Sequence, residues 1–122
     1  MDLNKVTEEI IRCAFTVANV LGVGFLEKTY ENALAHELRK AGLSVEQQKL
    51  MRVFYDGVPV GDYCADLLVQ GSVVVELRVV KSIDEVHVAQ CLNCLKTAGL
   101  KVCLLINFGA AKIQIKRIVH GP

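Results

Sequence analysis

The chain has 122 residues, of which 52% are hydrophobic, and its formal net charge at pH 7 is +1. This composition excludes a disordered chain and predicts one folded domain, residues 1–122, with its own hydrophobic core. A net charge so near zero excludes a general attraction to nucleic acid, so any phosphate-binding surface must be local. The sequence has neither a membrane-spanning apolar run nor a signal-peptide pattern, and we expect a soluble cytoplasmic protein. Five scattered cysteines do not indicate a disulfide framework.

Two helices are predicted in the first third of the chain. Apolar residues recur at helical spacing over Leu3–Leu21, and Asp2 is a suitable N-terminal cap. Gly22-Val23-Gly24 interrupts this pattern, and a second helix is expected over about Leu26–Ala41, ended by Gly42. The buried stripe of this second helix is expected to contain Leu26, Tyr30, Ala33, Leu34, Leu38 and Ala41.

Glu27 has two interpretations. It lies in the first turn of the second predicted helix, where a carboxylate interacts favourably with the helix dipole. It also lies beside the apolar stripe, one turn before Tyr30, where it could supply a third carboxylate to a functional site. The sequence leaves both interpretations open.

Three strands with short turns are predicted next, as an antiparallel meander. The chain is extended over Ser44–Phe54, and Asp56-Gly57 is typical of a hairpin turn. Pro59 begins the second strand. After the turn at Gln70–Ser72, the third strand runs over Val73–Val80.

A helix and two more strands complete the predicted fold. Ser82–Glu85 fits a capping box, and a helix is expected over about Ile83–Ala98. Lys101–Phe108 is almost entirely apolar, as in a strand covered on both faces, whereas Lys112–Lys116 alternates like a half-exposed edge strand. The segment Val73–Phe108 should form a right-handed parallel crossover. The predicted class is therefore α/β, in the order α-α-β-β-β-α-β-β, with helices packed on a central mixed sheet.

Two carboxylates occur in otherwise apolar strands. Asp66 and Glu76 each interrupt an oily run, and a buried acid is costly unless something pairs with it. If Gln70–Ser72 form a three-residue loop, Asp66 lies opposite Glu76, and both share a face with Arg78. We predict this register. The pair of acids suggests a cation between them.

These residues carry a resemblance to a known family. Gly24-Phe25-Leu26-Glu27-Lys28-Thr29-Tyr30 resembles the signature of the GxxExxY proteins, which belong to the PD-(D/E)XK nuclease superfamily. Asp66–Val69, Val75–Leu77 and the order of elements extend the likeness, which reaches Leu104–Gly109. The resemblance implies a restriction-endonuclease-like core and Mg²⁺-dependent phosphodiester hydrolysis.

The resemblance also implies roles for single residues. Asp66 and Glu76 match the metal-binding acids of the motif, and the carbonyl of Leu77 would be a main-chain metal ligand. Glu27 resembles a helical acid of some branches, and Gln90 resembles the glutamine of a Gln-x-x-x-Tyr motif. Such a site suits Mg²⁺, which takes one or two carboxylates together with water and phosphate oxygens. Nucleic acid is the implied partner, with DNA and RNA both open.

Several positions depart from the family pattern. Arg78 stands at the motif lysine; arginine can hold a phosphate bidentately but stays protonated and is a poor general base. Lys81 lies at an odd offset and cannot replace that lysine without a bulge. Cys94, Val23 and Ala18 occupy positions where the family carries tyrosine, proline and histidine. These departures argue against efficient catalysis, and the alternative is an inactive member acting as a binding or homo-oligomeric assembly module.

Two further features are assigned structural roles. Cys91 and Cys94 form a C-x-x-C, but it falls inside a helix and lacks the second ligand pair of a zinc site, so we expect packing thiols. The C-terminal basic residues are expected to protect an edge strand, with contact to a phosphate backbone as the minority interpretation. They are Lys112, Lys116, Arg117 and His120.

Overall fold

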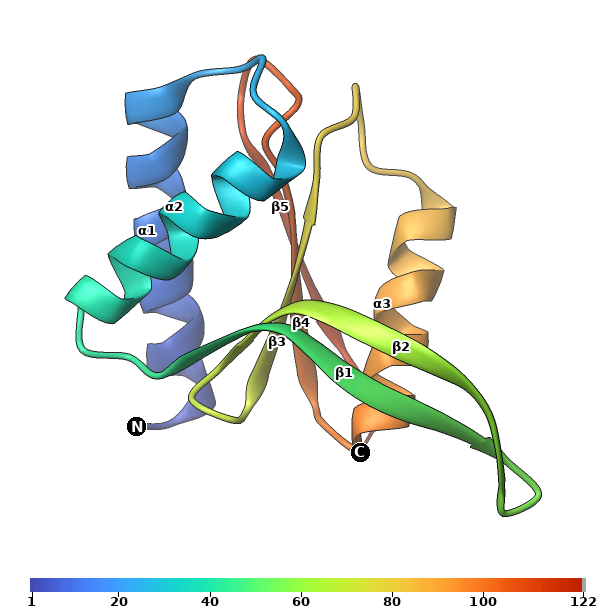
Figure 1. The fold of residues 1–122 in the computed structure, drawn as a ribbon. Helices are drawn as coiled ribbons and strands as arrows, with labels where there is room; N and C mark the ends of the chain where they lie inside the picture. Colours follow the sequence, from blue (N-terminus) through green and yellow to red (C-terminus); the bar gives the residue numbers. More distant parts are fainter. Residues whose placement is uncertain (122) are drawn as a thin grey trace.

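One mixed sheet with helices on both faces makes up the protein (Figure 1). The computed structural model describes residues 1–121, which contain α1 (Leu3–Leu21), α2 (Glu27–Lys40), β1 (Val45–Tyr55), β2 (Val58–Val69), β3 (Val73–Arg78), α3 (Glu85–Ala98), β4 (Val102–Asn107) and β5 (Gln114–Val119). The strands are hydrogen-bonded in the order β1-β2-β3-β4-β5. Only the β3–β4 pair is parallel, as the predicted crossover requires. The predicted class and order of elements are confirmed.

The helices divide the core into two layers. In β3, Val73, Val75 and Leu77 pack with the buried residues of α1 and α2, because side chains alternate between the faces of a strand. Val74 points to the opposite face and packs with buried residues of α3. Figure 1 shows α1 and α2 on one side of the sheet and α3 on the other. The strand β3 is therefore covered on both faces, and any charge on it is enclosed by protein.

The hairpin of β1 and β2 projects beyond the body of the domain (Figure 1). Asp56 and Gly57 turn the chain with φ angles of 53° and 74°, which is the left-handed conformation expected of this turn sequence. The tip carries exposed apolar side chains, among them Phe54 and Tyr55. The hairpin predicted from Asp56-Gly57 is confirmed.

The register between β2 and β3 is the one predicted. Val69 pairs with Val73, and Leu67 pairs with Val75. The loop is therefore Gln70–Ser72, and its central Gly71 has a φ of 61°. The same register brings Asp66 opposite Glu76.

Four predicted boundaries are wrong. The cap of α3 is Asp84, whose side chain accepts hydrogen bonds from Val86 and His87, and the capping box is completed by His87 rather than by Ser82 and Glu85. The strand β3 ends at Arg78, two residues before the predicted Val80. The last strand begins at Gln114, two residues after the predicted Lys112. Two positions of the predicted stripe of the second helix, Leu26 and Ala41, lie outside α2 and are exposed.

A buried asparagine explains the early end of β3. The side chain of Asn107 accepts from the amide of Val80 and donates to its carbonyl, at 3.0 and 2.9 Å. These bonds tie the chain after β3 to the end of β4. A Cβ atom at Gly109 would lie 2.4 Å from the Val80 nitrogen, so only glycine fits beside this clamp.

Within residues 1–121, no helix combines the length and the apolar character needed to cross a membrane. The five cysteines are free thiols, and Cys91 and Cys94 are buried in the layer beneath α3, as packing residues should be.

Candidate functional site

The site lies where β2 passes β3. The pairing of the two strands stops at Leu67 and Val75, and the next position is occupied by the Asp66 side chain instead of a backbone pair. Its Oδ2 accepts a hydrogen bond from the Leu77 amide at 2.8 Å. This bond holds the carboxylate against β3, next to Glu76.

Arg78 is the cation between the two acids. Its Nη1 lies 3.6 Å from Asp66 Oδ2 and 3.6 Å from Glu76 Oε2. Nη1 also donates to the Leu77 carbonyl at 2.6 Å, and Nη2 donates to Gln90 Oε1 at 2.9 Å. Burial lowers the pKa of Arg78, but the surrounding acidic groups, Glu76 first and then Asp66, together outweigh burial and raise it. The guanidinium therefore stays charged and is oriented by three elements.

Glu76 is the most enclosed charge of the site. The residue is 2% exposed, and its Oε1 is buried without a hydrogen-bond partner in the described part of the chain. Burial, followed by the nearby charge of Asp66, raises the pKa of Glu76 to about 9. A native protein rarely leaves such an oxygen without a partner, and a bound cation would supply one.

Glu27 faces the same charges from α2. It is the first residue of that helix and remains exposed. Partial desolvation raises the pKa of Glu27, the charge of Asp66 raises it further, and Arg78 opposes both. Glu27 is thus near enough to interact electrostatically with Asp66 and Arg78. Its position is compatible both with a charge at the helix start and with a third carboxylate of the site.

The loop before Glu27 is anchored by Tyr30. The ring of Tyr30 stacks on Phe108 with centroids 4.7 Å apart, and its hydroxyl donates to the Gly22 carbonyl at 2.6 Å. Gly24 has a φ of 108°, a conformation that favours glycine. The segment between Gly24 and Tyr30 therefore fixes where α2 starts and where Glu27 points.

Sequence reasoning missed a buried carboxylate and its amide partners. Glu31 is 2% exposed and accepts hydrogen bonds from Lys28, Gln47 and Gln48. The one available signal was its position four residues after Glu27, which places both on one helix face. Gln48 also donates to Asp66 Oδ1 at 3.3 Å, which connects this cluster to the site.

Tyr63 links β2 to α3 beside the site. Its hydroxyl donates to the Gln90 carbonyl at 3.2 Å, and burial raises the pKa of Tyr63. Burial also raises the pKa of Cys94 to about 12, so this thiol is not poised to react.

The oxygen atoms of the site satisfy part of the coordination that a hard divalent cation needs. Among residues 1–121, no three His, Cys, Asp or Glu side chains are grouped closely enough to hold a metal ion. Mg²⁺ needs only one or two carboxylates, since water and substrate phosphate supply the rest. Asp66 and the unpartnered oxygen of Glu76 meet that requirement. The Leu77 carbonyl is engaged by Arg78, so it can serve as a ligand only after the guanidinium moves.

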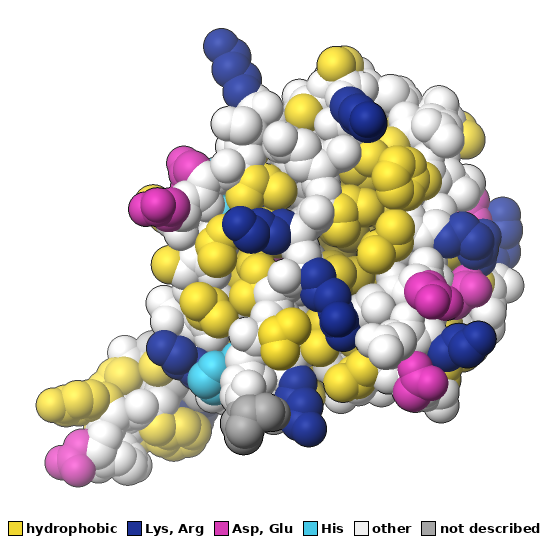
Figure 2. Space-filling model, turned by 180° about the vertical axis from the view of Figure 1, so that it is seen from behind, with side chains coloured by type: hydrophobic (Ala, Val, Ile, Leu, Met, Phe, Trp, Pro, Cys, Tyr) yellow, Lys and Arg dark blue, Asp and Glu magenta, His cyan; other side chains and the backbone are white. Residues whose placement is uncertain are grey.

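The basic C-terminal residues lie away from the carboxylates. β5 is the edge strand and is separated from β3 by β4. Figure 2 shows the basic side chains scattered among apolar ones, and no continuous basic patch forms on this face. Arg117 binds Asn4 of α1 at 3.2 Å. This surface therefore gives no support to the interpretation that the C-terminal basic residues contact a phosphate backbone.

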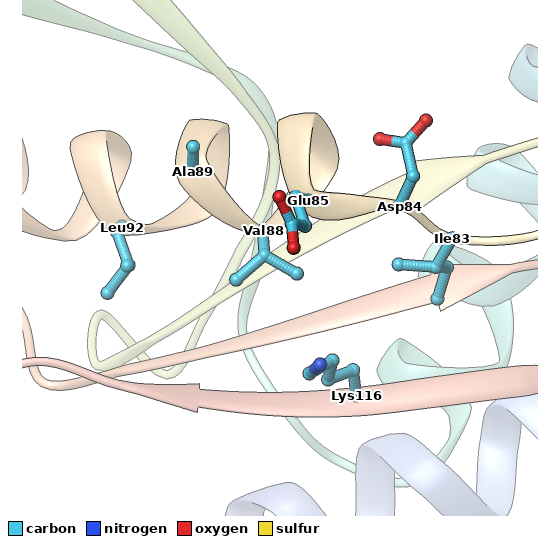
Figure 3. Close-up of a pocket in the computed structure, with 7 residues that line it drawn as sticks. All are labelled: Ile83, Asp84, Glu85, Val88, Ala89, Leu92 and Lys116. Atoms are coloured by element: carbon cyan, nitrogen blue, oxygen red, sulfur yellow. The ribbon is translucent and has the colours of Figure 1, made fainter.

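A groove of about 390 Å³ lies between α3 and β5. Ile83, Val88 and Leu92 point toward the strand, and Lys116 lies across from them (Figure 3). None of the predicted site residues lines it. The groove is therefore separate from the carboxylate site.

The fold and the paired carboxylates define the class of protein as a nuclease-like domain. The family model of the PD-(D/E)XK nuclease superfamily matches residues 4–118, and the chain belongs to that superfamily. Two solved structures are similar to it. SSO0001 has a TM-score of 0.58 at 16% identity over 98% of this chain, which spans 59% of that protein. An alkaline exonuclease from Laribacter hongkongensis has a TM-score of 0.52 at 13% identity, covering 94% of this chain and 82% of that protein.

At these identities the likeness concerns the fold alone. No curated protein matches the sequence.

Proposed function

We propose that the chain is a nuclease-like domain that binds nucleic-acid phosphate through a divalent cation, Mg²⁺, held by Asp66 and Glu76. The observation that carries this proposal is the buried Oε1 of Glu76, which lies in a carboxylate next to Asp66 and accepts no hydrogen bond within residues 1–121. Two ionised carboxylates enclosed together need a cation between them. Arg78 supplies one such charge, and Glu76 Oε1, which accepts no hydrogen bond from residues 1–121, is the oxygen that a second cation would bind.

Each predicted site residue has a role in this proposal. Asp66 and Glu76 hold the metal, and the Leu77 carbonyl completes its protein ligands. Arg78 contacts the phosphate, and Gln90 orients it through the bond at 2.9 Å. Glu27 adds negative charge at the N-terminal end of α2. A bound Mg²⁺ would polarise the phosphodiester and lower the pKa of an attacking water. Membership of the narrower GxxExxY group, to which the segment from Gly24 to Tyr30 points, belongs to the proposal.

A second candidate function is phosphate binding without cleavage. Arg78 stands where the motif has lysine, and its Nη1 already lies 3.6 Å from an oxygen of each acid. Because arginine stays protonated, it cannot take a proton from water. The chain would then act as a binding or homo-oligomeric assembly module, with DNA and RNA both open as its ligand.

Calorimetric titration with Mn²⁺ and Mg²⁺ tests the metal site. Wild type should bind, and the variant carrying Asp66→Ala with Glu76→Ala should not. A matched control removes two exposed acids of the β1–β2 hairpin, Glu46→Ala with Asp62→Ala, and should bind as wild type does. If wild type binds no cation even with an oligonucleotide present, or if the site variant binds equally well, the metal proposal is wrong.

Cleavage assays on DNA and RNA oligonucleotides then separate the two functions. Cleavage by wild type that is lost in the double site variant supports hydrolysis. Oligonucleotide binding without cleavage supports the second function.

A further inference from the structure

Gln48 has an unusual backbone for a strand residue. Its φ is 51°, in the left-handed region that residues other than glycine rarely adopt. It lies between the pairs Gln47–Leu67 and Lys49–Ala65, directly across from Asp66, and the pairing of β1 with β2 skips it. Strain of this kind persists only where the surrounding structure enforces it, and it concentrates at functional sites.

β2 changes its buried face at the level of Gln48. Leu67 packs in the layer beneath α1 and α2, whereas Ala65 packs in the layer beneath α3. Two residues apart on a regular strand would share a face. The irregular backbone of Gln48 therefore coincides with the point where β2 turns over and presents Asp66 to β3.

The side chain of Gln48 joins two carboxylates. Its Nε2 donates to Glu31 Oε1 at 2.5 Å and to Asp66 Oδ1 at 3.3 Å. A primary amide has two N–H donors, so both are used. Its Oε1 accepts from the Cys64 thiol at 3.2 Å, so the whole amide group is engaged.

Glu31 gives this amide a fixed anchor. Its Oε2 accepts from Lys28 at 3.0 Å and from Gln47 at 2.7 Å, and the residue is buried in the packing of α2. Gln47 in turn accepts from Arg39 at 3.2 Å. The carboxylate of Glu31 is thus held from both α2 and β1. Among the described residues, only Gln48 is hydrogen-bonded both to Glu31 and to Asp66.

We propose that Gln48 is a positioning residue for Asp66. Gln48 holds Oδ1 while the Leu77 amide holds Oδ2, so the carboxylate is fixed at both oxygens. The buried Glu31 sets the place of Gln48, and the site is thereby tied to α2. The role of Gln48 in metal binding rests on the proposed function, whereas its role in orienting Asp66 does not.

Gln48→Gly is the informative variant, because glycine accepts the left-handed backbone and removes only the side chain. Gln47→Ala is the matched control, since Gln47 binds Glu31 but does not contact Asp66. Loss of an outer hydrogen-bond partner typically weakens metal affinity about 10- to 100-fold. We expect that loss for Mn²⁺ in Gln48→Gly and an unchanged affinity in Gln47→Ala. Both variants lose a hydrogen bond to the buried Glu31, so both should melt at a lower temperature than wild type, and only Gln48→Gly should lose affinity for the metal.

Amide hydrogen exchange of the metal-free protein gives a second readout. Gln48→Gly should speed exchange at Leu77, whose N–H is bound by Asp66, while Val75 in the same strand keeps its protection. If Gln48→Gly fails to fold, Gln48→Asn replaces it, because asparagine tolerates this backbone but is too short to reach both carboxylates.

The outcomes separate the two proposals. If wild type binds Mn²⁺ and Gln48→Gly binds it equally well, the positioning role is wrong and the metal site stands. If wild type does not bind, the metal site is wrong, and exchange at the Leu77 amide decides the positioning role. Unchanged exchange at Leu77 would overturn that role.

Discussion

Replacing Glu76 with glutamine removes an enclosed carboxyl group and should stabilise the metal-free protein increasingly as the pH rises. Glutamine keeps the shape of the side chain but carries no charge. In the folded protein, burial and Asp66 raise the pKa of Glu76 from an ordinary value of 4.5 to about 9. Between these two pH values the folded chain holds a proton that the unfolded chain has released.

The sign of the effect follows from this proton. A group that binds its proton more tightly in the folded state contributes stability that is fully present below pH 4.5 and is lost as the pH rises toward 9. Each pH unit across this interval costs about 1.4 kcal/mol. By pH 7 the loss is about 3 kcal/mol, and at pH 5 it is below about 1 kcal/mol. Glu76→Gln should therefore be more stable than wild type by about those amounts.

Urea unfolding of chelator-treated protein at pH 5, 6, 7 and 8 measures this difference. Glu8→Gln, which removes an exposed carboxyl group of α1, is the control and should leave the pH dependence unchanged. If the free energies of unfolding of wild type and Glu76→Gln change in parallel with pH, the carboxyl group of Glu76 is not enclosed as described. A destabilised Glu76→Gln at pH 8 would refute the reasoning more strongly.

Three other variants test separate parts of the account by unfolding or binding. Gly109→Ala should cost about 1–3 kcal/mol of stability, because the new Cβ meets the backbone after β3, whereas Gly61→Ala meets nothing within 4 Å and should be nearly neutral. Tyr30→Phe should cost about 1 kcal/mol in urea unfolding, since it removes the hydroxyl that binds the Gly22 carbonyl; a neutral result would contradict the anchoring role. Arg78→Lys should tighten Mn²⁺ binding about tenfold, or about 1.4 kcal/mol, and allow cleavage of oligonucleotides, because lysine frees the Leu77 carbonyl. Unchanged binding and cleavage would show that the arginine is not what limits the site.

Much of the site could be predicted because strand geometry is simple. Side chains alternate along a strand, and loop length sets the register of a hairpin. The three-residue loop at Gly71 was therefore enough to place Asp66, Glu76 and Arg78 on one face. Gln90 was placed by family resemblance, and its contact with Arg78 is consistent with that placement.

Other features depend on contacts between distant parts of the chain. Nothing in the residue type of Gln48 predicts a left-handed backbone, which arises where β1 and β2 turn over beside Asp66. The cap of α3 was missed because Ser82 and Asp84 are both good caps two residues apart, and tertiary structure selects Asp84. The end of β3 is decided by Asn107, far along the chain, and no local pattern contains that information.

The most direct test of the metal site is anomalous scattering from crystals grown with Mn²⁺, with and without a short oligonucleotide. The proposed metal site predicts an anomalous peak at the carboxylates of Asp66 and Glu76, and an Arg78 guanidinium turned away from the Leu77 carbonyl. Crystals in which Arg78 keeps its bonds to Leu77 and Gln90, with no peak at the two acids in either condition, would contradict it.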